Sequence, residues 1–189
     1  MATLRRTLPI LAAAALIATG CGYNTIQSTD EAVNSAASQI KTQLQRRADL
    51  IPNLVETVKG VAKQESTIYI GVTEARSRLN SAVQGGSLQE MATANAALSS
   101  SLQRLLVTVE NYPELKSNQN YLQLQDQLEG TENRIAVARQ DYNKAVEDFN
   151  AYIRRFPYNL TAKIFGFGKP REYFELATPG AGEAPKVKF

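Results

Sequence analysis

The sequence predicts an all-α protein: a bundle of three to four long helices with a short C-terminal helix and loop. Three stretches carry apolar side chains at alternating steps of four and three residues, which places those side chains along one face of a helix. Two of the stretches follow a Ser-x-x-Glu pattern, which is typical of a helix N-terminus. The 189 residues are enough for one domain with a buried core, and we expect the bundle to span residues 28–175.

Residues 1–20 are predicted to be a signal peptide that is absent from the mature protein. Arg5 and Arg6 precede an apolar run from Leu8 to Ile17. That run is shorter than the roughly 20 residues that an α-helix needs to span a bilayer. The segment therefore indicates export and not a membrane-spanning helix.

Cys21, the only cysteine, is the predicted site of lipid attachment. The small residues before it resemble the lipobox of bacterial lipoproteins, although Ala18 stands where Leu is usual. The alternative is an ordinary signal peptide that leaves a free thiol, which is a liability in an oxidising compartment. Two or more acyl chains would hold the protein stably on a bilayer. In Gram-negative lipoproteins, an Asp directly after the cysteine causes retention at the inner membrane. This chain has Gly22 at that position, so the resemblance favours the outer membrane if the source is Gram-negative.

Residues 21–27 are expected to be a short lipidated tether, after which the Ser28–Glu31 capping box begins the first helix. The first stripe never loses phase, which predicts one long helix, or two helices that preserve phase through a junction. Its members are Val33, Ala37, Ile40, Leu44, Arg47, Ile51, Leu54, Val58, Val61, Glu65, Ile68, Val72, Ala75 and Leu79.

Pro52 lies inside the first stripe and leaves two interpretations. A proline removes one backbone donor and clashes with the carbonyl four residues earlier, here that of Ala48. The helix can be continuous and kinked near Pro52, or Asp49 can cap a new helix with Pro52 in its first turn. The unbroken phase of the stripe favours the kinked, continuous helix.

Gln84-Gly85-Gly86 is expected to end the first element, and the Ser87–Glu90 capping box to begin the second. Within the second stripe, Asn95 is the one polar member, and its expected role is to fix the register between helices. Asn111-Tyr112-Pro113 should end that helix. The second stripe comprises Leu88, Met91, Asn95, Leu98, Leu102, Leu105 and Val109.

A third stripe belongs to the last long helix, which should stop near Phe156-Pro157. Residues 160–174 are predicted to form a short helix and a loop over the bundle, and residues 176–189 a disordered tail. The third stripe comprises Leu128, Glu132, Ile135, Arg139, Tyr142, Val146, Phe149 and Ile153.

Charged residues occupy stripe positions where apolar side chains are expected. A buried charge is costly unless it is paired. We therefore expect an interhelical polar network in which Arg139 pairs with Glu65, and Glu132 pairs with Arg47 or Arg76. The alternative is that these side chains lie at the edge of the seam and reach water.

Missing residue types restrict the chemistry. The chain has no His and one Cys, so a Ser-His-Asp triad, a His-ligated metal site and an intrachain disulfide are impossible. Without Arg5 and Arg6, 19 basic residues face 18 acidic ones, a balance that gives no signature of nucleic-acid binding. We expect no enzymatic activity, no cofactor and no metal.

Four motifs in series resemble those of LemA family proteins over roughly residues 28–175. They are QRRADLIPNLV at residues 45–55, ENYPELK at 110–116, TENRIA at 131–136 and ARQDYN at 138–143. Gln64-Glu65 departs from the His-Glu of many members. The family-motif residues singled out as candidate sites are Arg46, Asp49, Pro52, Asn53, Asn111, Tyr112, Pro113, Asn133, Arg134, Tyr142 and Asn143. For each of them a structural role is favoured over ligand binding.

The resemblance implies an antiparallel helical bundle outside the cytoplasmic membrane, in a family without an established enzymatic activity. The favoured function is a lipid-anchored scaffold or interaction protein of the cell envelope, on its periplasmic face, with an unidentified envelope protein as partner and homo-oligomerisation left open. A membrane-surface remodeller acting through an amphipathic face or Phe165–Phe174 is the first alternative. A carboxylate-based metal site or enzyme built on Glu65 and Glu132 is the second, which the absence of His disfavours.

Overall fold

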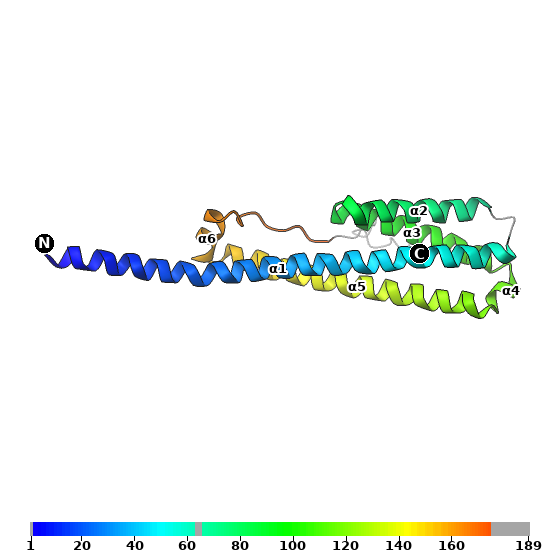
Figure 1. The fold of residues 1–189 in the computed structure, drawn as a ribbon, viewed down its shortest axis with the longest axis horizontal. Coiled ribbons are helices and arrows are strands. Elements are labelled where there is room, and N and C mark those ends of the chain that lie inside the picture. Colours follow the sequence, from blue (N-terminus) through cyan, green and yellow to red (C-terminus); the bar gives the residue numbers. More distant parts are fainter. Residues whose placement is uncertain (1, 63–65, 175–189) are drawn as a thin grey trace, which may run out of the picture. The chain divides into compact units, whose positions relative to one another are not determined.

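The computed structural model describes residues 2–62 and 66–174, with side chains from Gly22 onward, and each element in this part of the chain is a helix (Figure 1). The all-α prediction is therefore confirmed. The expected tail at residues 176–189 lies outside the described residues. The helices are α1 (Ala2–Val61), α2 (Ser66–Gly85), α3 (Leu88–Val109), α4 (Pro113–Lys116), α5 (Gln119–Arg154) and α6 (Tyr158–Ile164).

Helix α1 begins earlier than the sequence suggested and runs without a break through Pro52. The expected capping box at Ser28 is wrong, because Ser28 lies inside the helix and its hydroxyl donates to the Thr25 carbonyl at 3.0 Å. Residues 21–27, expected to be an extended tether, are helical and so advance only about 1.5 Å per residue. The prediction of a continuous helix through Pro52 is correct.

Of the two interpretations of the first stripe, the single helix to Gln84 is wrong and the pair of helices is correct, because α1 ends at Val61 and α2 starts at Ser66. Buried Tyr69 of α2 donates its hydroxyl to the Ala62 carbonyl, which supplies a donor just beyond the end of α1. Farther along, Arg76 contacts Ala48, so the two helices run antiparallel. Both helices bury an apolar face, so the stripe continues in phase from one to the other. The phase of the stripe therefore does not reveal that the chain reverses direction between them.

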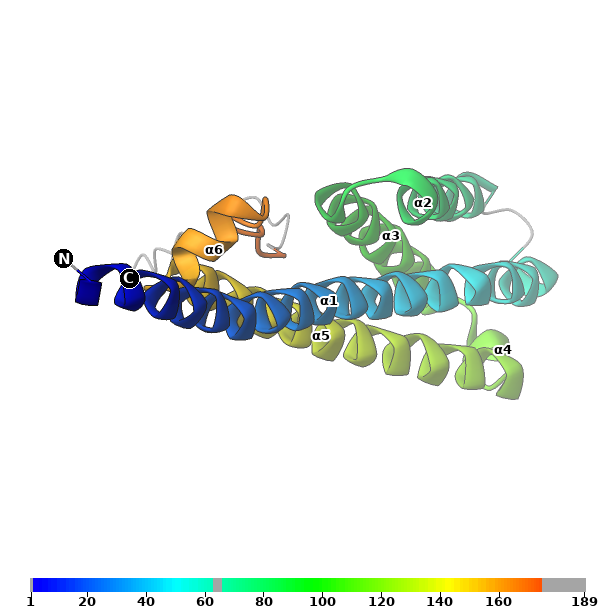
Figure 2. The same ribbon diagram turned by 60° about the vertical axis from the view of Figure 1, so that its left-hand side comes forward.

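By its contacts the chain divides into two compact units. Unit 2, which contains residues 39–138, brings together the end of α1, all of α2 and α3, and the start of α5, with α2 and α3 side by side (Figures 1 and 2). Nearly solvent-free side chains from these four segments and from α4 form its core. They include Ile40, Leu44, Ile51, Leu54, Leu79, Met91, Leu98, Leu105, Leu115 and Ile135.

The ends of the helices in unit 2 follow local sequence signals. The Ser87 hydroxyl accepts from the Glu90 amide at 3.2 Å and the Glu90 carboxylate accepts from the Ser87 amide at 2.8 Å, so the second predicted capping box is confirmed. Helix α3 ends just before Asn111-Tyr112-Pro113, as expected. The Asn118 side chain then caps α5 by accepting from the amides of Asn120 and Tyr121.

Unit 1 contains residues 1–38 and 139–173 and joins the first part of α1, the end of α5, and α6. The α6 segment lies beside α1 and the end of α5 (Figure 2). Tyr158 stacks on Tyr152 of α5 with ring centroids 4.5 Å apart, and the ring centroids of Phe165 and of Tyr23 in α1 are 4.6 Å apart. Gly22 fits closely here, since a Cβ at that position would lie 2.6 Å from the Tyr158 ring.

Candidate functional site

Unit 2 contains a buried arginine that links three helices. Arg47 of α1 is 5% exposed, and one of its terminal nitrogens, Nη1, donates to Asn95 Oδ1 of α3 at 2.6 Å and lies 2.5 Å from Glu132 Oε2 of α5 in an ion pair. The expected pairing of Glu132 with Arg47 is therefore present. Asn95 was expected to fix the register between helices. Its side-chain oxygen accepts from Arg47 and so ties one position of α3 to one position of α1.

The environment of Arg47 works against its charge. Burial lowers the pKa of Arg47, whereas the nearby carboxylate of Glu132 acts in the opposite direction. The Glu132 side chain is 49% exposed, so water shares in neutralising it. The Arg47 Nε is buried and has no hydrogen-bond partner within the described part of the chain. This network thus specifies an arrangement of helices more than it adds net stability.

Arg76 has a different role from the one predicted. Its Nε donates to the Ala48 carbonyl at 2.9 Å, so Glu132 is not its partner. Ala48 lies four residues before Pro52, and its carbonyl therefore lacks the helical donor that a proline cannot supply. Arg76 of α2 replaces that donor, which explains how α1 tolerates a proline in its interior. Arg46, Asp49 and Asn53, which also flank Pro52, are exposed.

The other expected ion pair joins Arg139 and Glu65. Glu65 lies outside the described residues, and Arg139 is half-buried on α5 in unit 1. Cys21 lies within the bounds of α1.

The family-motif residues divide into a large exposed group and a small buried one. Tyr142 is buried, and Tyr112 and Asn143 are half-buried. Asp49 accepts from the Gln45 amide at 2.8 Å, a contact within the exposed surface of α1. The exposed members are Arg46, Asp49, Pro52, Asn53, Asn111, Pro113, Asn133 and Arg134.

Unit 1 holds a second polar arrangement, which the sequence reasoning missed in part. The segment after α6, residues 169–173, is here called the C-terminal strap. Buried Asn150 of α5 accepts from the Arg171 amide at 2.8 Å and donates to the Arg171 carbonyl at 2.9 Å, as a neighbouring β-strand would. Tyr142 donates to the Glu172 carbonyl at 2.9 Å. Asn150 lies four residues after Val146 of the apolar stripe, and that spacing could have marked it as buried.

An ion pair completes the strap. The Arg171 guanidinium donates to Asp30 Oδ1 of α1 from Nη2 at 2.7 Å and from Nε at 3.1 Å. Burial raises the pKa of Tyr142. The positive charge of Arg171 opposes this shift, and the negative charge of Glu172 adds to it. Side chains of α1 and α5 therefore fix the backbone of the strap in one register.

A cleft of about 390 Å³ opens beside Arg47 among α1, α3 and α5. Its walls include Leu54, Leu102, Leu106 and Leu128, and its polar end is formed by Arg47 and Glu132. The cleft can hold apolar groups, with one cation and one carboxylate already paired at its end.

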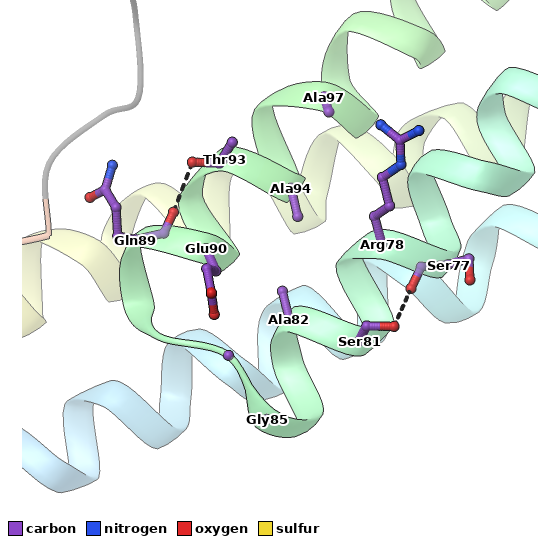
Figure 3. A pocket seen from close by; sticks show the side chains of 11 residues that line it. Ser77, Arg78, Ser81, Ala82, Gly85, Gln89, Glu90, Thr93, Ala94 and Ala97 are labelled. Carbon is purple, nitrogen blue, oxygen red and sulfur yellow. Dashed lines mark hydrogen bonds between the residues drawn. The ribbon is translucent and has the colours of Figure 1, made fainter.

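A shallower groove of about 650 Å³ follows the α2–α3 hairpin, where small side chains such as Ala82, Ala94 and Ala97 leave space (Figure 3). Figure 3 shows the hydroxyls of Ser81 and Thr93 turned to the carbonyls of their own helices, at 3.1 and 2.9 Å. Their protons are therefore already donated, and the groove offers shape more than chemistry.

No cluster of three or more Cys, Asp or Glu side chains suited to a metal ion occurs within residues 22–62 and 66–174. Over the helices that the structure describes, none combines the length and the apolar character needed to cross a membrane.

The family model of the LemA family matches residues 36–189. The chain belongs to the LemA family. It is 29% identical over 204 aligned residues to magnetosome protein MamQ 2 of Paramagnetospirillum magneticum, covering 95% of this chain and 74% of that protein. Magnetosome protein MamQ of Magnetospirillum gryphiswaldense is 27% identical, with 87% and 68% covered. Protein LemA of Metamycoplasma hominis is 26% identical, with 74% and 63% covered. The resemblance seen in the sequence motifs is thus confirmed.

Proposed function

We propose that this LemA family protein is a lipid-anchored protein of the cell envelope that acts as a non-enzymatic interaction or scaffold module. The observation that carries the proposal is the position of Cys21, directly after a short apolar segment and a run of small residues. Acylation there would tether the helical body to a membrane surface, with the outer membrane favoured in a Gram-negative source.

The polar networks support a scaffold over an enzyme. In unit 2, Arg47, Asn95 and Glu132 hold helices to one another, and Arg76 serves the carbonyl freed by Pro52. In unit 1, Tyr142 and Asn150 hold the strap. These side chains are engaged in fixing the fold, and no nucleophile with an adjacent base emerges among them.

The test compares the full chain with its Cys21→Ser variant in cells. The wild-type protein should fractionate with membranes after a carbonate wash, and mass spectrometry should find an acylated N-terminal cysteine. The variant should become soluble outside the cytoplasm or accumulate as an uncleaved precursor. Thr19→Ser, which keeps a small residue two positions before the cysteine, is the matched control and should behave as the wild type.

A processed Cys21→Ser protein that still resists the carbonate wash would contradict lipid anchoring. The interaction function needs a separate experiment, in which proteins crosslinked to this chain in intact cells are identified after membrane solubilisation. One envelope protein recovered reproducibly with the wild type, and lost when the chain is left in the cytoplasm, is the expected result. Recovery of no specific partner would argue against a scaffold.

A further inference from the structure

The α6 region of unit 1 carries a concentration of exposed apolar side chains. Among the described residues, half of the ten exposed large hydrophobic side chains lie within residues 156–173. Leu160 and Ile164 lie four residues apart on α6 and are 52% and 77% exposed, so they share one outward face. Phe156, in the turn between α5 and α6, is 80% exposed. Phe165 and Tyr173 add to the same segment. Clustered apolar exposure of this kind marks an interaction surface.

The charges around this face have one sign. Residues 149–171 contain five basic residues and no acidic residue. Arg171 is paired with Asp30, whereas Arg154, Arg155, Lys163 and Lys169 are exposed and form no ion pair within the described part of the chain. Apolar and aromatic side chains flanked by Lys and Arg are the composition of a surface that lies in the interface of an anionic bilayer.

The neighbours of this face point to the same partner. Tyr158 packs on Gly22, and Phe165 packs on Tyr23. These two residues of α1 follow Cys21 directly, and no charged residue occurs between Cys21 and Asp30. Side chains of α6 therefore lie against the residues next to the predicted lipid.

We infer that the α6 face, defined by Phe156, Leu160, Ile164 and Phe165 with Arg154, Arg155, Lys163 and Lys169, docks onto an anionic lipid bilayer. This is a second membrane contact besides the lipid on Cys21. It orients unit 1 at the surface, because the apolar side chains enter the interface while the cations contact lipid phosphates. A protein partner is disfavoured by the small area of a seven-residue helix and by the single sign of charge.

The chain has no Trp, so a single introduced Trp reports on one site. The full chain carrying Ile164→Trp is reconstituted on vesicles of one part phosphatidylglycerol to two parts brominated phosphatidylcholine. Its emission should shift to the blue and be quenched several-fold more than that of Val107→Trp, an exposed apolar position in unit 2. Gln140→Trp, an exposed position of unit 1 about 20 Å along α5 from its end, is the second control.

Charge variants then test the electrostatic part. In the Ile164→Trp background, each of Lys163→Gln and Lys169→Gln should weaken docking about fivefold on anionic vesicles. High salt should act in the same direction. Quenching at position 164 no greater than at the controls would overturn the inference. Equal quenching on vesicles of phosphatidylcholine alone would overturn the role of the cations. Lipidation of Cys21 is read separately by mass spectrometry, so failure of the anchor and failure of this contact are distinguishable.

Discussion

Arg47 is the only charged side chain that is buried within the described residues, and its partners are unequal. Asn95 is a neutral hydrogen-bond acceptor, whereas Glu132 is an ion-pair partner that also faces water. The loss of Glu132 would leave a nearly solvent-free guanidinium with one neutral partner. The loss of Arg47 would instead leave a carboxylate that can hydrate. The two single substitutions should therefore cost different amounts of stability.

We predict that Glu132→Ala lowers the free energy of unfolding by about 1–3 kcal/mol, because it orphans a buried charge that keeps one neutral bond. Arg47→Met should cost less, and the double variant should cost less than the sum of both. Urea unfolding of the four proteins of the cycle measures the coupling. Glu74→Ala, whose partner Arg78 is exposed at 3.9 Å, is the control and should change stability by about 0.5 kcal/mol or less. Additive effects in the Arg47 cycle would mean that the contact carries no coupling.

Pro52 and Arg76 give a second prediction at the scale of single residues. Arg76→Met should destabilise the protein by about 1–3 kcal/mol, because the Ala48 carbonyl loses its one donor. In a Pro52→Ala background, the new backbone amide at position 52 can reach that carbonyl, so the same substitution should cost much less. Chemical unfolding of both pairs checks this. Equal costs in the two backgrounds would show that Arg76 acts through some other contact.

At the scale of elements, the α2–α3 turn contains two adjacent glycines with different surroundings. A Cβ on Gly86 would lie 2.7 Å from the Ala82 carbonyl oxygen and 2.6 Å from the capping carboxylate of Glu90, whereas a Cβ on Gly85 would meet nothing within 4 Å. Gly86→Ala should therefore cost about 1–3 kcal/mol through overpacking and a displaced cap. Gly85→Ala should be neutral or slightly stabilising. Thermal unfolding followed by circular dichroism separates them, and identical shifts in Tm would contradict this account.

The strap behaves as an element without regular structure of its own. Asn150→Leu keeps the volume of the side chain but removes both hydrogen bonds to Arg171. We expect the rate of hydrogen exchange at the Arg171 amide to rise at least tenfold. A tenfold rise corresponds to about 1.4 kcal/mol of lost protection, and the loss of two hydrogen bonds can cost that much. Gln140→Leu, an exposed site on the same helix, should leave that amide unchanged. Unchanged exchange in Asn150→Leu would mean that Asp30 and Tyr142 suffice to hold the strap.

The helices themselves could largely be predicted from the sequence. Periodicity located the buried faces of α3 and α5, and Ser87 and Pro113 marked helix ends through local chemistry. The reversal after Val61 could not be predicted, since a stripe in constant phase fits one helix or an antiparallel pair equally well. The capping box at Ser28 misled because a Ser-x-x-Glu pattern also occurs inside helices, where the hydroxyl bonds to an earlier carbonyl.

At the scale of the whole molecule, the polar sites depend on which helices meet. The sequence flagged Arg47 and Glu132 because charges stood on apolar stripes, and the structure brings them together. Arg76, the alternative partner of Glu132, donates to Ala48 instead, because the antiparallel return of α2 places that side chain opposite this carbonyl. The exposure of Phe156 and Ile164 was equally out of reach. Whether an aromatic cluster covers a core or faces outward depends on packing that no local pattern encodes.

The response of the whole molecule to pH follows from the residue types that it lacks and from three raised pKa values. There is no His, the side chain whose ordinary pKa lies between pH 5 and 8, so the free energy of unfolding should be nearly flat between about pH 6 and 8. Burial raises the pKa of Tyr121 and of Tyr142, and a hydrogen bond to Asp148 raises that of Lys144.

A folded-state pKa above the unfolded value means that the folded protein keeps its proton when the unfolded chain loses it. The stability from such a group is complete below the ordinary pKa, 10.0 for tyrosine, and is lost as the pH rises through the raised value.

We therefore expect stability to fall above about pH 10, when the buried hydroxyls of Tyr121 and Tyr142 are forced to ionise. Urea unfolding at a series of pH values, compared with a Tyr121→Phe/Tyr142→Phe variant, measures the effect. The variant should be less stable at neutral pH, because the Glu172 carbonyl loses its donor, and should decline less steeply above pH 10. A loss of stability between pH 6 and 8, or an equally steep decline in the variant, would show that other groups control the response.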